Sequence, residues 1–280
     1  MRALVEKIIE NAVDFHIHAS PDPFTERSID PFEAALQAKG IGMKGIVLKS
    51  HHYPTAPVAC MLAEAVKGVE VIGSLALNKS VGGINPSAVE ASAKMGAKVI
   101  WMPTTSAVGV RKRKGFDDGV PVVGNDGKPL AEVSEVLALI REYDLVLCTG
   151  HISEDEIIAL FSEARKFNLK KIVVTHPLKV AGTSIALAIQ RELADQGAYI
   201  EHCFGATFSL TGSLNPKKIV EAVKLIGVEK CIVSTDFGKY HKPLPSEGMR
   251  MMIATLLECG LSEKELHALV KTTPGLLLGL

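Results

Sequence analysis

Short apolar runs alternate with longer amphipathic stretches along all 280 residues of the chain. The apolar runs are rich in β-branched residues and predict eight strands: Val13–His18, Lys44–Lys49, Glu70–Leu77, Lys98–Met102, Leu145–Thr149, Lys171–Thr175, Ala198–Cys203 and Lys230–Thr235. The stretches between them predict helices at Pro31–Lys39, Val58–Lys67, Pro86–Met95, Ala131–Glu142, Glu154–Phe167, Thr183–Gln196 and Pro216–Ile226. Capping residues placed before an N1 proline, such as Asp30 before Pro31, support these helix starts.

This alternation predicts a single (β/α)8 barrel, a TIM barrel, over residues 1–280. The longest interval between strands holds an insertion at residues 103–130, expected at the active face, with a small hairpin at Asn125-Asp126-Gly127. An open doubly wound sheet would also alternate in this way. No glycine-rich dinucleotide motif follows the first strand, however, so the barrel is favoured.

Composition limits the kinds of partner. The 31 basic and 31 acidic residues cancel, which argues against an electrostatic grip on nucleic acid or on a membrane surface. No apolar run is long enough to span a bilayer, and the N-terminus reads as a short amphipathic helix rather than a signal peptide. Five widely spaced cysteines without a CxxC motif favour reduced thiols. We therefore expect a cytoplasmic protein that binds a small molecule, and the composition is compatible with a homo-oligomer.

The first predicted strand ends in two alternate histidines, His16 and His18. Residues i and i+2 of a strand point to the same face, so the two imidazoles should project together, with Phe15 and Ile17 on the opposite face. Two imidazoles side by side can bind one metal ion. The alternative is a polar strand face with two hydrogen-bonded histidines.

Three other strands also end in residues that bind metals. The fifth strand runs into His151, the sixth into His176 and the eighth into Asp236. Because catalytic residues of a (β/α)8 barrel lie at the carboxyl ends of its strands, these side chains should meet at one mouth. The sequence therefore predicts a metal site to which His16 and His18 contribute and whose other ligands come from across the barrel.

This order of histidines and aspartate resembles that of the amidohydrolase superfamily of metal-dependent hydrolases. The closing segment, residues 260–280, is also similar to the end of that family, and the opening FHIHASPDPFTER is similar to uncharacterised bacterial and archaeal members. The resemblance implies His16, His18, His151 and Asp236 as metal ligands. It implies His176 as a ligand of a second metal or as an electrophile that faces the substrate.

One departure from the family affects the expected number of metal ions. Binuclear members place a carboxylated lysine or a glutamate at the end of strand four, where this chain reads Val99-Ile100-Trp101-Met102-Pro103-Thr104. We therefore expect one tight ion rather than two. Lys49, at the end of strand two, is either a bridging carbamate or a lysine that binds substrate or stabilises the structure. The ligand types suit zinc, and manganese, iron, cobalt and nickel are chemically admissible.

The expected activity is metal-dependent hydrolysis of a C–N or C–O bond in an amide, ester or lactone. Asp236 would serve as general base, while His176 or the metal polarises the substrate. One alternative is a phosphoesterase of the polymerase and histidinol phosphatase (PHP) type, in which Ser50-His51-His52 would add ligands. Another is a mononuclear decarboxylase of the same superfamily. A barrel that binds metal and ligand without catalysis is a third.

Several weaker candidates follow from position alone. The residues considered for substrate binding are Arg27, His51, Arg111, Arg113 and Glu201. Runs of basic residues such as 111–114 are usually exposed charge, whereas on an active face they could meet an anionic group. Either Glu201 or its neighbour His202 should face the mouth, and the sequence leaves both open. Cys148 and Cys203 are expected to pack in the barrel.

Overall fold

Eight parallel strands, hydrogen-bonded to one another in sequence order, form the centre of the protein. The computed structural model describes residues 1–178, 184–208 and 213–280. The strands are β1 (Val13–His18), β2 (Gly45–Lys49), β3 (Glu70–Ala76), β4 (Ala97–Trp101), β5 (Val146–Cys148), β6 (Ile172–Thr175), β7 (Tyr199–Cys203) and β8 (Cys231–Ser234). Each predicted strand is confirmed to within one residue at either end, so the predicted (β/α)8 fold class is correct.

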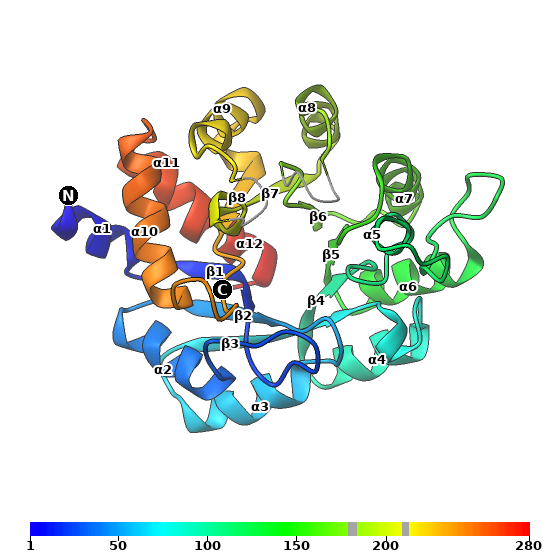
Figure 1. The fold of residues 1–280 in the computed structure, drawn as a ribbon, viewed down its shortest axis with the longest axis horizontal. Helices are drawn as coiled ribbons and strands as arrows, with labels where there is room; N and C mark the ends of the chain where they lie inside the picture. Colours follow the sequence, from blue (N-terminus) through cyan, green and yellow to red (C-terminus); the bar gives the residue numbers. More distant parts are fainter. Residues whose placement is uncertain (179–183, 209–212) are drawn as a thin grey trace.

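The helices form a ring around these strands (Figure 1). They are α1 (Arg2–Ile9), α2 (Pro31–Gly40), α3 (Ala56–Ala65), α4 (Pro86–Lys94), α5 (Val108–Arg113), α6 (Ala131–Glu142), α7 (Glu154–Lys166), α8 (Leu187–Asp195), α9 (Lys217–Ile226), α10 (Pro245–Glu258), α11 (Glu263–His267) and α12 (Thr273–Leu278). Three short 3-10 segments and one π-helical turn complete the elements: η1 (Lys79–Val81), η2 (Phe204–Phe208), η3 (Val228–Lys230) and η4 (Ala268–Thr272). The predicted start of the eighth helix, Thr183, lies outside the described residues.

The barrel closes between β1 and the chain that follows β8. The amide of Asp236 donates to the carbonyl of His16 at 2.9 Å, and the amide of His18 donates to the carbonyl of Phe237 at 2.8 Å. These bonds leave no exposed strand edge between the first and last strands. They also bring two segments that carry candidate ligands into direct contact.

Alternate residues of the strands pack into two separate apolar layers. One layer fills the barrel interior, and it includes Val99 and Trp101 of β4, Val146 of β5 and Leu277 of α12. The other layer lies between the strands and the surrounding helices. Buried parallel strands of this kind read as continuous apolar runs, which is why the strands were visible in the sequence. Because α12 supplies residues to the interior layer, the C-terminal helix packs against the barrel interior.

A β-bulge interrupts β1 between Asp14 and Ile17. Asp14 pairs with Ile46 and Ile17 with Leu48, so a step of three residues on β1 faces a step of two on β2. Phe15 belongs to the interior layer, whereas Ile17 belongs to the outer layer. The expectation that Phe15 shares the face of Ile17 was therefore wrong, because strict alternation fails at the bulge.

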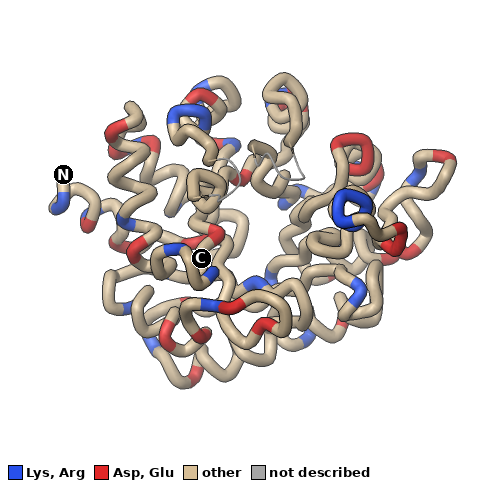
Figure 2. Tube along the Cα trace, in the orientation of Figure 1, with Lys and Arg blue, Asp and Glu red and all other residues tan. Residues whose placement is uncertain are grey.

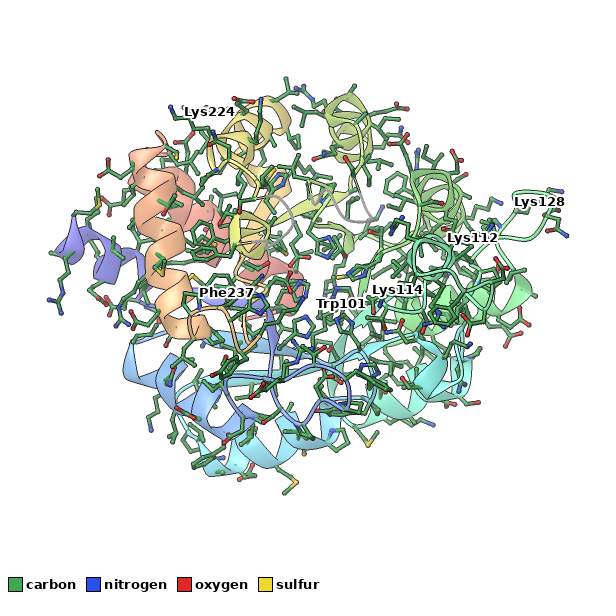
Figure 3. All side chains as sticks on the ribbon, in the orientation of Figure 1. Trp101, Lys112, Lys114, Lys128, Lys224 and Phe237 are labelled. Carbon is green, nitrogen blue, oxygen red and sulfur yellow. The ribbon has the colours of Figure 1, made fainter. Side chains whose placement is uncertain are left out.

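The insertion at residues 103–130 contains α5 and a hairpin. Val123 and Pro129 form an antiparallel bridge around Asn125-Asp126-Gly127, which confirms the predicted turn. The labelled Lys128 lies at the edge of the molecule, away from the barrel centre marked by Trp101 (Figure 3). The tip of this hairpin is thus a peripheral feature.

Charged residues of both signs are interspersed along the chain (Figure 2). Among residues 1–178, 184–208 and 213–280, we find no helix with the length and apolar character needed to cross a membrane.

Candidate metal centre

Three of the predicted metal ligands, His16, His18 and Asp236, converge where β1 ends and β8 has just ended. Nε2 of His16 lies 3.3 Å from Nε2 of His18. Oδ1 of Asp236 lies 3.4 Å from the first nitrogen and 3.3 Å from the second. All three side chains are buried, at relative exposures of 5% or less. The three donor atoms therefore form a nearly equilateral triangle inside the protein.

These spacings fit a divalent metal. Donor atoms placed tetrahedrally about 2.0–2.2 Å from a zinc ion lie about 3.3–3.6 Å from one another. The triangle of His16, His18 and Asp236 has sides in this range. Two imidazoles and one carboxylate also form a donor set typical of catalytic zinc sites. The residues present therefore fit the expected ion.

Glu201 fixes the orientation of His16 from the opposite side of its ring. Oε1 of Glu201 lies 3.1 Å from Nδ1 of His16 and accepts a hydrogen bond from Oγ of Ser234 at 2.6 Å. A carboxylate at Nδ1 favours the tautomer with the proton on that nitrogen, which leaves the lone pair of Nε2 available to a metal. Glu201 thus faces the site, and the choice that the sequence left open between Glu201 and His202 is settled by the structure.

His151 and His176 form a second pair of histidines. Their Nε2 atoms lie 3.1 Å apart, and the ring of His176 lies 6.1 Å from that of His16 between centroids. His51 also belongs to this cluster, with its ring 4.8 Å from that of His18 and 5.9 Å from that of His151. The structure therefore brings all the predicted ligands together, but it groups His151 with His176 rather than with the compact triangle.

Lys49 reaches the same place from β2. Its Nζ lies 3.0 Å from Nε2 of His16 and 4.7 Å from the centroid of the Trp101 ring. Trp101 stands at the end of β4, where binuclear members of the resembled family carry their bridging residue, and it is fully buried. An indole supplies no metal-binding atom. The end of β4 is therefore closed by an aromatic ring beside the amine of Lys49.

Burial shapes the protonation of the site. It lowers the pKa of His18 and that of His51 well below 6.5, which favours the neutral imidazoles that metals bind. Burial also lowers the pKa of Lys49, against the opposing effect of the Asp236 and Glu201 carboxylates. Burial would raise the pKa of Glu201, but the charge and hydrogen bond of His16 and the hydroxyl of Ser234 outweigh it and hold the pKa below 4.5.

The backbone at two candidate ligands is strained. His176 and Asp236 have φ angles of +33° and +52°, a region that non-glycine residues rarely adopt. Asp14 fixes the chain just before Asp236, because its carboxylate accepts from the amide of Thr235 at 3.0 Å and from the hydroxyl of Thr235 at 2.5 Å. Gly238 then passes so close to His18 that a Cβ there would lie 1.7 Å from the His18 carbonyl oxygen. Tight packing thus holds the loop that presents Asp236.

The arginine candidates fall in different places. Arg111 donates from Nε and Nη2 to Asp118 at 2.6 and 3.0 Å and stacks on Phe116, so it is held within the insertion. Arg113 ends the short helix α5 in the same insertion. Arg27 lies in the loop after β1, where its side chain is buried and paired with Asp22. Of the three, Arg27 is tied most closely to the elements that carry the histidines.

Three residues of the site were not singled out as site residues in the sequence. Ser234 precedes Asp236 by two positions and contacts Glu201, while Trp101 adjoins Lys49. Cys203, which we expected to serve only in packing, has its Sγ 3.6 Å from Nδ1 of His16 and, with His16 and Glu201, forms a second compact group of possible ligands. If the strand register had been known, the residues of β7 and β8 that point into the barrel would have included Cys203 and Ser234.

The fold of this protein is similar to those of solved amidohydrolases and related enzymes. The probable dipeptidase PvdM from Pseudomonas aeruginosa matches with a TM-score of 0.69 at 13% identity, over 99% of this chain and 98% of the other. The putative 2-pyrone-4,6-dicarboxylic acid hydrolase from Pseudomonas putida matches with a TM-score of 0.64 at 17% identity, over 96% and 97%. An amidohydrolase from Burkholderia multivorans with bound zinc matches with a TM-score of 0.64 at 14% identity, over 96% and 99%.

By sequence, the chain belongs to DUF6282, a family of unknown function whose model matches residues 11–201. No curated protein matches the sequence. The likeness to the solved structures confirms the expected (β/α)8-barrel fold.

Proposed function

We propose that this protein is a metal-dependent hydrolase that cleaves a C–N or C–O bond, in an amide, ester or lactone, of a small molecule. The observation that carries this proposal is the triangle of donor atoms from His16, His18 and Asp236, with sides of 3.3–3.4 Å. It lies at the carboxyl ends of the strands, where barrel enzymes carry their active sites. Fold likeness to amidohydrolases supports the same reading.

His16, His18 and Asp236 would hold the ion, with Glu201 orienting His16 behind them. The chemistry that a divalent ion would supply here is a bound water whose pKa falls from 15.7 to about 7. We favour zinc, which the donor set suits and which a structural neighbour contains. We also favour one tight ion, because Trp101 stands where a bridging residue would be needed.

Other side chains of the site would supply the remaining catalytic functions. Asp236 accepts the proton of the attacking water and passes it to the leaving group, as a positioned general base and acid. His176 lies across the site from His16 and polarises the substrate oxygen or binds a second, weaker ion. The buried Trp101 ring excludes water beside Lys49, which strengthens electrostatic interactions in this part of the site.

A phosphoesterase of the PHP type is the second candidate, because His51 lies among the histidines of the site. Its ring is 4.8 Å from that of His18, and its Nδ1 is 2.8 Å from Oγ1 of Thr104. A further imidazole in this position suits two or three metal ions and a phosphate substrate. Metal content and substrate chemistry separate the two candidates.

We further infer that the protein works in a cytoplasm on a small-molecule substrate, without a nucleic-acid or membrane partner. Five cysteines, each a free thiol, support a reducing compartment. Equal numbers of acidic and basic residues support the absence of a polyanionic partner.

The deciding experiment is an assay of zinc- and manganese-loaded protein against panels of amides, esters, lactones and phosphoesters, with carbon dioxide release followed in parallel on aromatic acids. Asp236→Asn serves as the matched control for contaminating activity. Hydrolysis of a C–N or C–O bond by the wild type, lost in the variant, is the expected result. Phosphate release would favour the second candidate, carbon dioxide release a decarboxylase, and no turnover by any metal-loaded sample would reject an enzyme of these classes.

A further inference from the structure

Arg27 is a buried arginine of which only Nε and Nη2 donate to Asp22. Its side chain is 1% exposed, and its Nε and Nη2 donate to the same oxygen of Asp22 at 3.0 and 2.5 Å. Asp22 itself is fixed, because its other oxygen accepts from the amides of Phe24 and Thr25 at 2.9 Å each. The loop after β1 is thus built around this ion pair.

Nη1 of Arg27 is buried and has no hydrogen-bond partner among residues 1–178, 184–208 and 213–280. A guanidinium carries five N–H donors, and the two that bind Asp22 leave the outer Nη1/Nη2 edge unused. A buried charged donor without a partner is costly, so it calls for a physical reason such as a ligand. Two parallel N–H groups on one edge match the two oxygens of a carboxylate or phosphate.

The neighbours of Arg27 belong to elements that also carry the candidate metal ligands. The partner carboxylate of Asp22 lies 3.8 Å from Nε2 of His52, and the ring of His52 lies 6.1 Å from that of His51. The backbone of Arg27 forms a bridge with Lys239, three residues beyond Asp236. Arg27 is therefore anchored from β1 on one side and from the Asp236 loop on the other.

We propose that the Nη1/Nη2 edge of Arg27 binds an anionic oxygen group of the substrate, either a carboxylate or a phosphate. This inference rests on the proposed hydrolase function for the identity of the ligand as substrate, but the anion site itself can be tested without turnover. The substrate would be an anionic small molecule, held by Arg27 while the bond to be cleaved lies over His16, His18 and Asp236.

The binding test is calorimetric titration of the zinc-loaded protein with succinate, with inorganic phosphate and with neutral succinamide. We expect one of the anions to bind and succinamide to fail. Arg27→Gln should weaken that binding about 10–100-fold, the usual worth of a charged hydrogen-bonded pair. Arg27→Lys, which keeps the charge but loses the fork, should weaken it less, and the exposed Arg191→Gln should leave it unchanged.

A variant of the metal site shows whether the anion binds to Arg27 or to the metal. In His16→Ala, binding through Arg27 should persist, whereas an anion held by the metal alone should be lost. Circular dichroism and thermal unfolding show whether Arg27→Gln and Arg27→Lys are folded. If Arg27→Gln is unfolded, Arg27→Lys alone decides the test. Preference for succinate assigns a carboxylate, and preference for phosphate assigns a phosphate.

The results for the two proposals are separable. Binding of neither anion, or equal binding by wild type and both Arg27 variants, overturns the anion site. If hydrolysis is found, kcat/KM can be compared for two changes. Removing the anionic group from the substrate should lower the kcat/KM of the wild type as much as Arg27→Gln lowers it on the intact substrate. Most of either change should be in KM. Arg27-dependent anion binding without any hydrolysis keeps the anion site and rejects the hydrolase.

Discussion

Oε1 of Glu201 lies 3.1 Å from Nδ1 of His16, so one carboxylate on β7 sets the tautomer of an imidazole on β1. The proton held at Nδ1 leaves Nε2, on the far side of the ring, to face His18 and Asp236. On the proposed metal site, Glu201 would act on the ion through His16 rather than by contact, as a positioning residue.

Glu201→Gln should weaken metal binding about 10–100-fold, because a neutral amide no longer enforces the Nδ1–H tautomer of His16. Competition with a chromogenic chelator measures the Kd for zinc. The exposed Glu192→Gln on α8 is a matched control and should bind as wild type does. Unchanged affinity in Glu201→Gln would reduce Glu201 to a packing role.

His16→Ala and His18→Ala should each remove most of the bound metal while the barrel stays folded, since each deletes one corner of the donor triangle. Elemental analysis gives the metal content, and circular dichroism reports the fold. Wild-type metal content in both variants would move the ion elsewhere.

The purified protein should carry about one tight metal ion per chain, with a second ion binding weakly. The reason is that His151 and His176 form a pair without a bridging group from β4. A zinc titration should therefore show two phases, and His176→Ala should remove only the weak one. Two equally tight ions, with a carbamate on Lys49, would contradict this assignment.

Asp236→Asn should lower the rate of catalysis by roughly 10²–10⁴ while metal content falls only in part. The amide retains a ligand oxygen but cannot accept a proton. Pre-steady-state rates at matched metal loading provide the comparison. Near-equal rates in wild type and variant would transfer the role of base to another group, with His176 next in line.

His202 should make the protein sensitive to acid. Burial lowers its pKa from 6.5 to about 4, and both ring nitrogens are buried without a hydrogen-bond partner in the described part of the chain. The folded state therefore favours the neutral ring, so this contribution to stability is complete above pH 6.5 and is lost as the pH falls through about 4.

His202→Leu should accordingly flatten the fall in the free energy of unfolding between pH 7 and pH 4. The difference between 6.5 and about 4 corresponds to as much as about 3 kcal/mol. Urea denaturation at several pH values measures it, and the exposed His241→Gln is the control. Parallel pH profiles of wild type and His202→Leu would show that His202 does not set the acid limit.

The barrel could be predicted from the sequence because every strand is buried on both faces and reads as a short apolar run between capped helices. The positions of His16, His18, His151, His176 and Asp236 followed from the same pattern, since each lies within three residues of a strand end. Their shared location required only the rule that carboxyl ends of parallel strands meet at one mouth.

The partnerships within the site could not be predicted, because they depend on register. Whether Glu201 or His202 faces inward is decided by one step along β7, and the sequence around them is apolar on both sides. Lys49 gave the same difficulty: its nearness to His16 depends on the pairing of β1 with β2, which the bulge shifts. The role of Arg27 depends on a loop fold that Asp22 determines.

The bulge in β1 allows a strand of only six residues both to pack in the barrel interior and to present two imidazoles. Val13 and Phe15 fill the barrel interior, and the extra residue of the bulge lets His16, the neighbour of Phe15, face Asp236 together with His18. Loss of one residue at the bulge would make the step from Asp14 to Ile17 equal on both strands and restore regular alternation, so that only one residue could point inward where Phe15 and His16 now do. In this strand, the number of residues constrains the chemistry more tightly than the identity of its apolar half.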